Sequence, residues 1–253
     1  MIHDRDTGQR RGGTQDDQSR DSAAWTYARI VDHDPLMGWA RGTQALAAIW
    51  DQRYLDAAQL TEDGRTHISA GMGAARVHAI QARALAALGD PAQAREAIRA
   101  AEIARAHADR DELHDRIAGE FTFDDAKLRY YESLSLLDSE HPAEAEQAAA
   151  AAIKLYHAVP VRARSYGCEA LARVQLARAA LMADRLEDAA DALGSVLALD
   201  PQRRISSLNQ HLEGCRELLQ GPAHLSSAAS RQLDQQLAAF SAASTARALP
   251  GGQ

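Results

Sequence analysis

From Trp25 onward, apolar residues recur every three or four positions, which is the spacing of one face of an α-helix. Short segments rich in Gly, Asp or Pro interrupt this periodicity and predict helix ends. The expected breaks are His33-Asp34-Pro35, Glu62-Asp63-Gly64, Gly89-Asp90-Pro91, His141-Pro142, Val159-Pro160, Asp200-Pro201 and Gly221-Pro222. The pattern predicts an all-α fold.

The helical segments also repeat. QARALAALGDPAQAREAIRAAEIA combines a helix, a Gly-Asp turn and a second helix that carries Ala94, Ile98 and Ala101 on one face. Three similar segments place Ala57, Ala145 and Ala189 at the corresponding point. These anchors lie 37, 51 and 44 residues apart, longer than the interval of about 34 in tetratricopeptide repeats, which the pattern resembles. We expect antiparallel helix pairs stacked into a right-handed superhelix.

The pattern also predicts the limits of this domain. Residues 1–22 lack periodic apolar positions and predict a disordered polar tail. The helical-repeat domain is expected over 23–244 and a frayed C-terminus over 245–253. Gly119 to Phe123 predicts a loop packed by its phenylalanines. Two amphipathic segments after Pro201 predict a terminal helix pair, with its apolar face formed by Leu208, Leu212, Leu218, Leu219, Leu233, Leu237 and Phe240.

Composition and charge narrow the function. Hydrophobic residues make up 46% of the chain and aromatic residues 5%, which favours closely packed helices. The net charge of −7 argues against nucleic-acid binding through the overall field. The sequence has no apolar run of membrane-spanning length and no apolar leader, so a cytoplasmic protein is expected. Cys168 and Cys215 have no metal-type spacing and are interpreted as core residues.

Three segments carry a more specific resemblance. AGMGAARVHAIQARALAALGD, GEFTFDDAKLRYYESLSLL and LARVQLARAAL, followed by DPQRR, resemble the C-terminal tetratricopeptide regions of actinomycete-type helix-turn-helix transcriptional regulators. The resemblance covers about residues 39 to 240. It implies a sensor module that binds a peptide or small ligand, or self-associates. The segment before Trp25 is too short and polar for a helix-turn-helix, so we do not expect direct DNA binding.

The candidate ligand-binding residues lie on the first helix of each pair, which lines the concave surface of such superhelices. Aligning the repeats on their turns places five residues there: Arg76, Arg83, Lys127, Tyr130 and Arg178. A basic groove would suit a carboxylate terminus, an acidic peptide or a phosphorylated ligand. The alternative is that these are solvated helix positions that pair with Asp or Glu.

The sequence predicts no enzyme activity, cofactor or metal. His107, Asp111 and His114 share one helix face, but a solvated helix end explains them equally. The alternative function is an enzyme, or an enzyme accessory, with a closed pocket around Glu120, His114 and Tyr130. A third reading is that the basic inner face contacts nucleic acid.

Assembly is predicted from the two ends of the domain. Trp25, Trp39 and Trp50 cluster near its N-terminal end and suit either a first-repeat core or an interface. The final segment, Ser227 to Ala243, has only Arg231 and Asp234 as charges. Its small uncharged face predicts a homodimer through the last helix pair, the alternative being a capped monomer.

Overall fold

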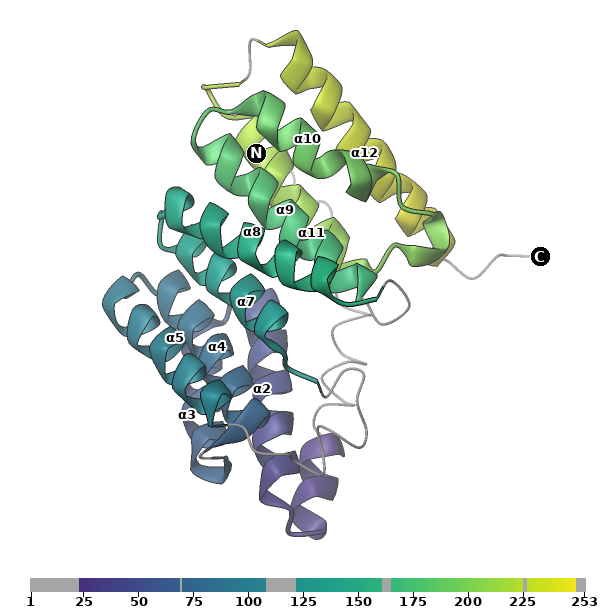
Figure 1. Cartoon of the computed structure of the whole chain (residues 1–253). Helices are drawn as coiled ribbons and strands as arrows, with labels where there is room; N and C mark the ends of the chain where they lie inside the picture. Colours follow the sequence, from purple (N-terminus) through teal and green to yellow (C-terminus); the bar gives the residue numbers. More distant parts are fainter. Residues whose placement is uncertain (1–22, 69, 108–121, 161–164, 225–226, 249–253) are drawn as a thin grey trace, which may run out of the picture. The chain divides into compact units, whose positions relative to one another are not determined.

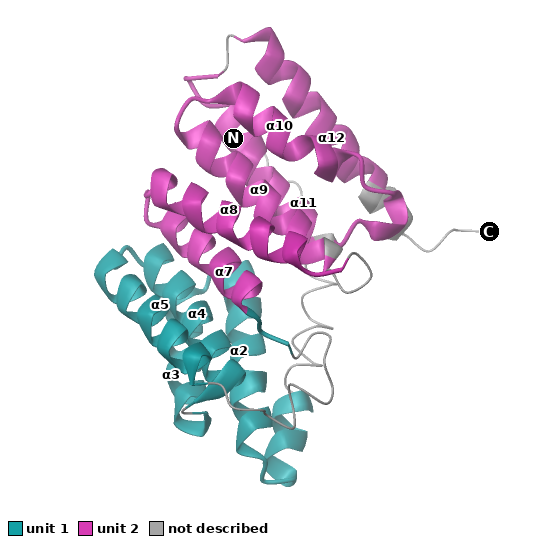
Figure 2. Cartoon of the chain, viewed as in Figure 1, with its two compact units in different colours: residues 1–124 teal, residues 125–253 magenta. Residues whose placement is uncertain are grey.

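The fold was analysed in a computed structural model of the whole chain (Figure 1). It describes residues 23–68, 70–107, 122–160, 165–224 and 227–248. In these ranges every regular element is a helix, which confirms the all-α prediction. The chain divides into two compact units, residues 1–124 and 125–253, coloured teal and magenta in Figure 2.

The first unit is a series of packed neighbouring helices. A short helix over residues 23–30 precedes α2 (Asp34–Trp50), α3 (Tyr54–His67), α4 (Gly71–Ala87) and α5 (Pro91–Ala106). Helix α2 packs on α3 and also on α4, and α4 packs on α3 and α5. Consecutive helices therefore pack on each other, and α2 and α4, which are two places apart in the chain, are also in contact.

The second unit is built in the same way. It contains α7 (Asp125–Asp138), α8 (Pro142–Ala158), α9 (Tyr166–Met182), α10 (Leu186–Leu197), the short 3₁₀ turn η3 (Pro201–Arg203), α11 (Ser206–Leu219) and α12 (Ala228–Ala248). Helix α9 is central, because it contacts α7, α8, α10 and α11, and α12 closes the unit by packing on α10 and α11.

One turn geometry recurs at the tip of four helix pairs. Three residues separate the helices, and the middle one has a left-handed backbone, with φ of 60° at Gln52, 81° at Gly89, 61° at Glu140 and 57° at Asp184. The third turn residue donates its N–H to the carbonyl five residues earlier, as from Arg53 to Ala48 at 2.8 Å. This is the Schellman arrangement that satisfies the last carbonyls of a helix.

The predicted anchor residues occupy equivalent places in these pairs. Ala57, Ala94, Ala145 and Ala189 are each the fourth residue of the second helix and are at most 1% exposed. A methyl group at this point permits close helix contact and leaves no cavity. The structure thus confirms adjacent packed helix pairs and the predicted register of their small residues.

The expected break at Glu62-Asp63-Gly64 is wrong, since all three residues lie inside α3. Gly64 is buried where α3 approaches α2, and a β-carbon there would lie 3.1 Å from the β-carbon of Arg41. The glycine therefore serves close packing, whereas the chain breaks before Gly71, which has φ of 83°. At the other end, α12 continues to Ala248, past the expected limit at 244, because its last turn contains the helix-favouring Ala246, Arg247 and Ala248.

The core confirms most of the predicted apolar face of the terminal pair. Its fully buried members are Leu208, Leu212, Leu219, Leu233, Leu237 and Phe240, whereas Leu218 is partly buried. Phe123 is also buried, next to the start of α7, while Phe121 and the expected tail over 1–22 lie outside the described residues.

Candidate functional site

Arg178, in the fourth turn of α9, has an unusual environment for an arginine of this chain. Its side chain is partly buried, and its Nη1 donates to Gln175 Oε1, one turn earlier, at 3.1 Å. Its buried Nε has no hydrogen-bond partner. No carboxylate of the described residues lies within 4.0 Å of the guanidinium nitrogens. Arg178 is therefore a partly buried cation without a countercharge in this part of the chain.

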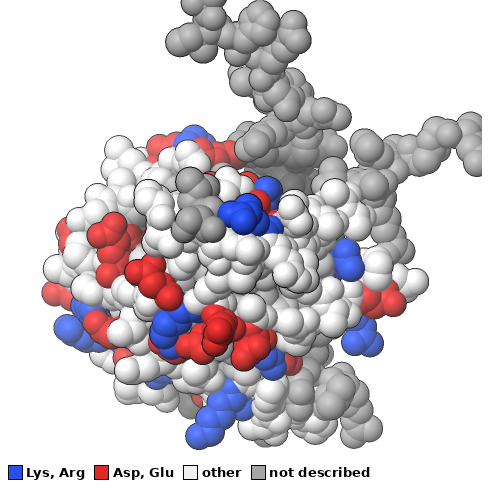
Figure 3. All heavy atoms as spheres, turned by 90° about the horizontal axis from the view of Figure 1, so that it is seen from above, with Lys and Arg blue, Asp and Glu red and all other residues white. Residues whose placement is uncertain are grey.

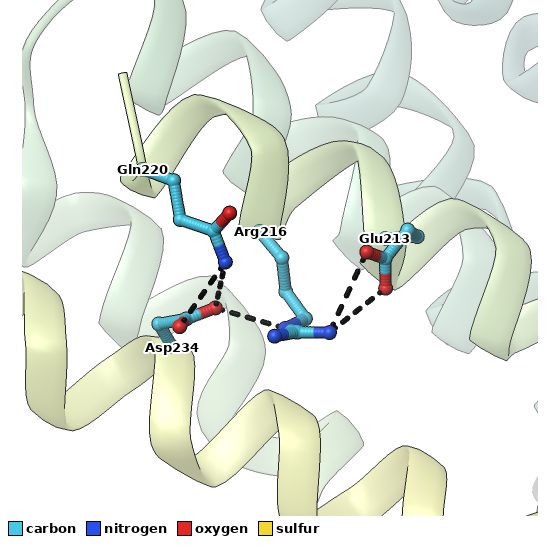
Figure 4. Close-up of polar contacts among 4 residues, drawn as sticks. All are labelled: Glu213, Arg216, Gln220 and Asp234. Carbon is cyan, nitrogen blue, oxygen red and sulfur yellow. Dashed lines mark hydrogen bonds and ion pairs between the residues drawn. The ribbon is translucent and has the colours of Figure 1, made fainter. Parts of the chain in front are cut away.

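Arg216 on α11 shows the contrasting case (Figure 4). Its Nε donates to Asp234 Oδ1 on α12 at 2.8 Å, and its Nη1 donates to Glu213 at 3.1 Å. Gln220 adds a hydrogen bond to Asp234 at 3.3 Å. Six further arginines also pair with a carboxylate, namely Arg41, Arg53, Arg65, Arg129, Arg173 and Arg185.

A glycine on the neighbouring helix makes room for Arg178. Helix α11 packs on α9, and Gly214 on α11 faces the arginine side chain. A β-carbon at position 214 would lie 3.2 Å from Arg178 Nε, closer than ordinary van der Waals contact. Any larger residue here would therefore displace the guanidinium.

A buried chain of polar groups leads away from Arg178. Gln175, which is completely buried, places its Nε2 3.3 Å from His211 Nδ1 on α11. The other imidazole nitrogen, Nε2, lies 3.2 Å from the hydroxyl of Tyr130 on α7. We call Tyr130, His211, Gln175 and Arg178 the polar chain. It links α7, α9 and α11 and brings together Tyr130 and Arg178, two of the residues predicted from the sequence.

The chemistry of Arg178 fixes the direction of these hydrogen bonds. A guanidinium can only donate, so the Gln175 oxygen must face Arg178 and the Gln175 NH₂ must face His211. Turned this way, the Gln175 NH₂ lies 3.5 Å from the Leu171 carbonyl oxygen as well as 3.3 Å from His211 Nδ1.

The thiol nearest to this site is unsuited to nucleophilic chemistry. Cys215 is fully buried on α11, and burial raises the pKa of its thiol to about 12, only partly opposed by the positive charge of Arg178. The thiolate, not the thiol, is the nucleophile. Cys168, on the first turn of α9, is only partly buried, so the core position predicted for both cysteines is found for Cys215 alone.

Arg76 does not occupy the accessible position expected of a groove residue. It is 7% exposed and donates to the Trp39 carbonyl at 3.2 Å and to Thr43 Oγ1 at 3.1 Å. Its guanidinium carbon lies 3.9 Å from the centre of the Trp39 ring. Gly42 leaves the space for it. The side chain thus ties α4 to α2, because an aromatic face and backbone oxygens attract a buried guanidinium.

The remaining predicted ligand residues are partly buried. Arg83 lies on α4 in the first unit, and Lys127 lies on α7 in the second. Neither belongs to the polar chain. Gln175, His211 and Gly214 were not predicted from the sequence, although the spacing of Gln175 and Arg178 by three residues on one helix was a usable signal for a contact.

The residues considered for catalysis or metal binding are mostly outside the described part. Asp111, His114 and Glu120 are not among the described residues. His107 directly follows α5, and its Nδ1 lies 2.7 Å from the Ile103 carbonyl oxygen. Within the described ranges, no group of three or more His, Cys, Asp or Glu side chains is placed to hold a metal ion.

On the face shown in Figure 3, acidic side chains form several clusters with basic side chains beside them, and no broad basic area appears there. Among the described helices, none combines the length and apolar character needed to cross a membrane.

Comparisons with protein-family models and with curated proteins find no match for this chain.

Proposed function

We propose that this protein is a non-catalytic, tetratricopeptide-like binding protein that recognises a carboxylate of a peptide or partner protein through Arg178. The observation that carries the proposal is the partly buried Arg178 guanidinium, which Gln175 orients and which no carboxylate of the described residues neutralises.

Solvation favours a carboxylate ligand at Arg178. Removing a cation from water is costly unless another group compensates it. A carboxylate meets this need well, because its two oxygens can accept parallel hydrogen bonds from a guanidinium. Arg178 is the one member of the polar chain whose charge is permanent, so a ligand there would meet one fixed positive charge. This favours a single carboxylate over a phosphate, which carries more charge.

The position of Arg178 supports a scaffold role. Helices α7, α9 and α11 are the first helices of successive pairs, and α9 packs directly on both α7 and α11. Repeat proteins bind partners on surfaces built from several such elements. The resemblance to sensor regions of transcriptional regulators motivates a regulatory partner in the cytoplasm, without direct binding to DNA.

A peptide-binding experiment tests the proposal. The full chain is screened against short peptides with free C-terminal carboxylates, the same peptides with amidated C-termini, and peptides carrying internal Asp or Glu. We expect binding in a carboxylate arm and a loss of about tenfold or more in Arg178→Ala, the usual effect of removing a charged hydrogen-bond partner. Arg99→Ala, an exposed change on α5, is the control. Equal binding by Arg178→Ala and wild type would refute the assignment of Arg178.

A further inference from the structure

We infer that a pocket between the first short helix, residues 23–30, and α2 binds a small, uncharged apolar molecule. The pocket belongs to the first unit and has a volume of about 430 Å³. Sites for small molecules commonly measure about 300–1,000 Å³ and are lined mainly by apolar and aromatic side chains. The inference goes beyond the proposed function, because Arg178 lies in the second unit and does not line this pocket.

The pocket lies between matching apolar faces of two successive helices. Four residues line it from the first helix and the turn that follows, at the spacing i, i+3, i+4 and i+7: Ala24, Tyr27, Ala28 and Val31. The same spacing recurs among the lining residues of α2, which are Leu36, Trp39, Ala40 and Thr43. Residues so spaced lie on one side of a helix. Because three of these side chains are methyl groups of alanines, the two faces meet without filling the space between them.

A tight turn holds the two helices at the pocket. Asp32 has a left-handed backbone, with φ of 50°, and the His33 N–H donates to the Ala28 carbonyl at 3.1 Å. The His33 ring also accepts from the Leu36 N–H at 3.3 Å and so caps the start of α2. The turn therefore fixes how the lining residues of one helix face those of the other.

The Trp39 wall of the pocket is held from α4. The Arg76 guanidinium carbon lies 3.9 Å from the centre of the Trp39 ring, and Arg76 Nη2 donates to Thr43 Oγ1 at 3.1 Å. The Thr43 hydroxyl in turn donates to the Trp39 carbonyl at 3.1 Å. The hydroxyl that α2 brings to the lining is thus already bonded as donor and as acceptor, so α2 offers a ligand mainly apolar contact. A wall held in this way lowers the entropy cost of binding.

The chemistry of the lining selects an uncharged ligand. None of the described lining residues carries a charge, and the lining has only two hydroxyls, those of Thr43 and Tyr27. An ion that enters such a site loses its hydration without compensation. A molecule with an apolar body and at most one hydroxyl therefore fits the pocket better than a charged one.

Larger occupants require more apolar surface than this region supplies. Residues 1–22 contain only two large apolar side chains, Met1 and Ile2. A stable protein–protein interface buries about 800 Å² on each partner. The exposed large apolar side chains of this helix and turn are Tyr27, Ile30 and Val31, at 69%, 72% and 62% exposure, and even a tyrosine buries only about 150–250 Å². The available area thus favours a small molecule over a second copy of the chain or a partner protein.

Calorimetry on the full chain tests the chemical class of the ligand. The probes are primary alcohols from butanol to octanol and the primary amines of the same chain lengths. Each added CH₂ should tighten alcohol binding about fourfold, equivalent to about 0.8 kcal/mol, until the pocket is filled. The amines are positively charged at neutral pH and should bind about tenfold or more weakly. An alcohol affinity that does not rise with chain length, or equal affinity of amines and alcohols, would overturn the inference.

Two substitutions to phenylalanine test the location. Ala24 lines the pocket and is exposed, so Ala24→Phe can fill the pocket without disturbing the core. Ala23→Phe is the matched control, because Ala23 is also exposed but does not line the pocket. With octanol as probe, Ala24→Phe should lose about tenfold or more in affinity, as two or more CH₂ groups lose their place. Ala23→Phe should bind as wild type; unchanged affinity in Ala24→Phe would refute the assignment of the pocket.

Two further measurements separate the possible occupants and the two sites. In the ¹H–¹⁵N NMR spectrum, octanol should shift the signals of Trp39, Ala40 and Thr43 and leave that of Gly214, beside Arg178, unchanged. The reverse pattern would place the alcohol at the Arg178 site and overturn the inference. If Ala24→Phe, but not Ala23→Phe, lowers the ligand-free mass in light scattering from two chains to one, the occupant is a second copy and a small-molecule site is wrong.

The result does not depend on the carboxylate-binding proposal. If no carboxylate peptide binds wild type, the alcohol series and the Ala24→Phe variant still decide the role of this pocket. If the alcohols fail and a carboxylate peptide binds through Arg178, the proposed function stands alone. Circular dichroism of each variant verifies that the helices are intact.

Discussion

Gly214 on α11 and Arg178 on α9 lie so close that a β-carbon at position 214 would come within 3.2 Å of the arginine Nε. Arg76 has a similar relationship to Gly42 in the first unit, where a β-carbon would lie 2.5 Å from Nη1. In both units a glycine on one helix accommodates an arginine from another. Arg76, however, is held by Trp39 and Thr43 of its own unit and is 7% exposed, whereas the buried Nε of Arg178 has no hydrogen-bond partner.

Gly214→Ala should weaken carboxylate binding more than it changes stability. The new methyl group forces the Arg178 guanidinium to move by a few tenths of an ångström, while alanine favours the helix by about 1 kcal/mol. Titration with the carboxylate peptide and thermal unfolding measure the two effects. Gly194→Ala is the matched control, because a β-carbon at this exposed site on α10 meets nothing within 4 Å. It should stabilise the protein and leave binding unchanged; equal binding by both variants would contradict the prediction.

Ala189→Leu should destabilise the second unit by about 1–3 kcal/mol, the usual cost of overpacking a filled core. Ala189 is 0% exposed at the anchor position of α10. The adjacent Ala190 is exposed, so Ala190→Leu is a control with the same chemical change at a solvent-facing position. Urea unfolding monitored by circular dichroism measures both. A small effect at 189 would show that the anchor position tolerates larger side chains.

Cys215 should be unreactive toward thiol reagents in the folded protein. Its pKa of about 12 leaves almost no thiolate at pH 8, and its burial denies access. In a Cys168→Ala variant, an aromatic disulfide reagent should therefore label no thiol until denaturant is added. Rapid labelling without denaturant would mean that α9 and α11 separate easily in solution.

Glu169 should make stability depend on acid pH. Burial raises the pKa of its carboxyl, but hydrogen bonds from His157 at 2.9 Å and Arg173 at 3.1 Å outweigh burial, so the pKa is lower than the usual 4.5. A carboxyl whose pKa is lower in the folded than in the unfolded chain stabilises the fold at pH values above the unfolded pKa. This contribution is lost as the pH falls through the folded pKa. The stability advantage of wild type over Glu169→Gln should be a few tenths of a kcal/mol near neutrality.

That advantage should shrink below about pH 4.5, the unfolded value. Urea unfolding at a series of pH values measures it, with Glu187→Gln, an exposed change on α10, as the control for general acid effects. An advantage that stays constant down to strongly acidic pH would contradict the assigned direction of the pKa.

The predicted homodimer has to be tested at an exposed residue of α12, because the apolar residues of this helix are buried inside the unit. Leu237 is completely buried within the second unit, so changing it would damage the fold. The exposed face of α12 is formed by Ala228, Ala229, Arg231, Gln232, Gln235, Gln236, Ala239, Ala242 and Ala243. Light scattering should give a mass about twice that of one chain, which is 27.3 kDa. The Ala239→Glu variant should have the mass of a single chain. A wild-type mass that stays at one chain as concentration rises would rule the dimer out.

Helix positions were predictable because they depend on local sequence. Ala145 and Glu140 illustrate this, since a small residue at a fixed distance after a polar turn determines both the packing and the register. Gly64 was misread because a glycine needed for close helix contact and a glycine that ends a helix look alike in sequence. Only the position of the partner helix distinguishes them.

The site was predictable only in part, because its contacts join residues distant in sequence. Tyr130 and His211 are 81 residues apart, and no periodicity connects them. Arg76 and Arg178 both lie on first helices of their pairs, yet Trp39 and Thr43 hold the first inside its unit. The sequence could identify which residues lie on the first helices but could not show which arginine the neighbouring helix holds inside its unit.

The recurring turn has a consequence for how such a chain can evolve. Gln52, Gly89, Glu140 and Asp184 adopt one backbone geometry with four different side chains, so the turn constrains sequence very little. Together with one small anchor residue, it leaves most surface positions of each helix pair open to substitution. Whole pairs could then be duplicated or exchanged while the chain still folds, because each pair carries its own turn and its own anchor residue.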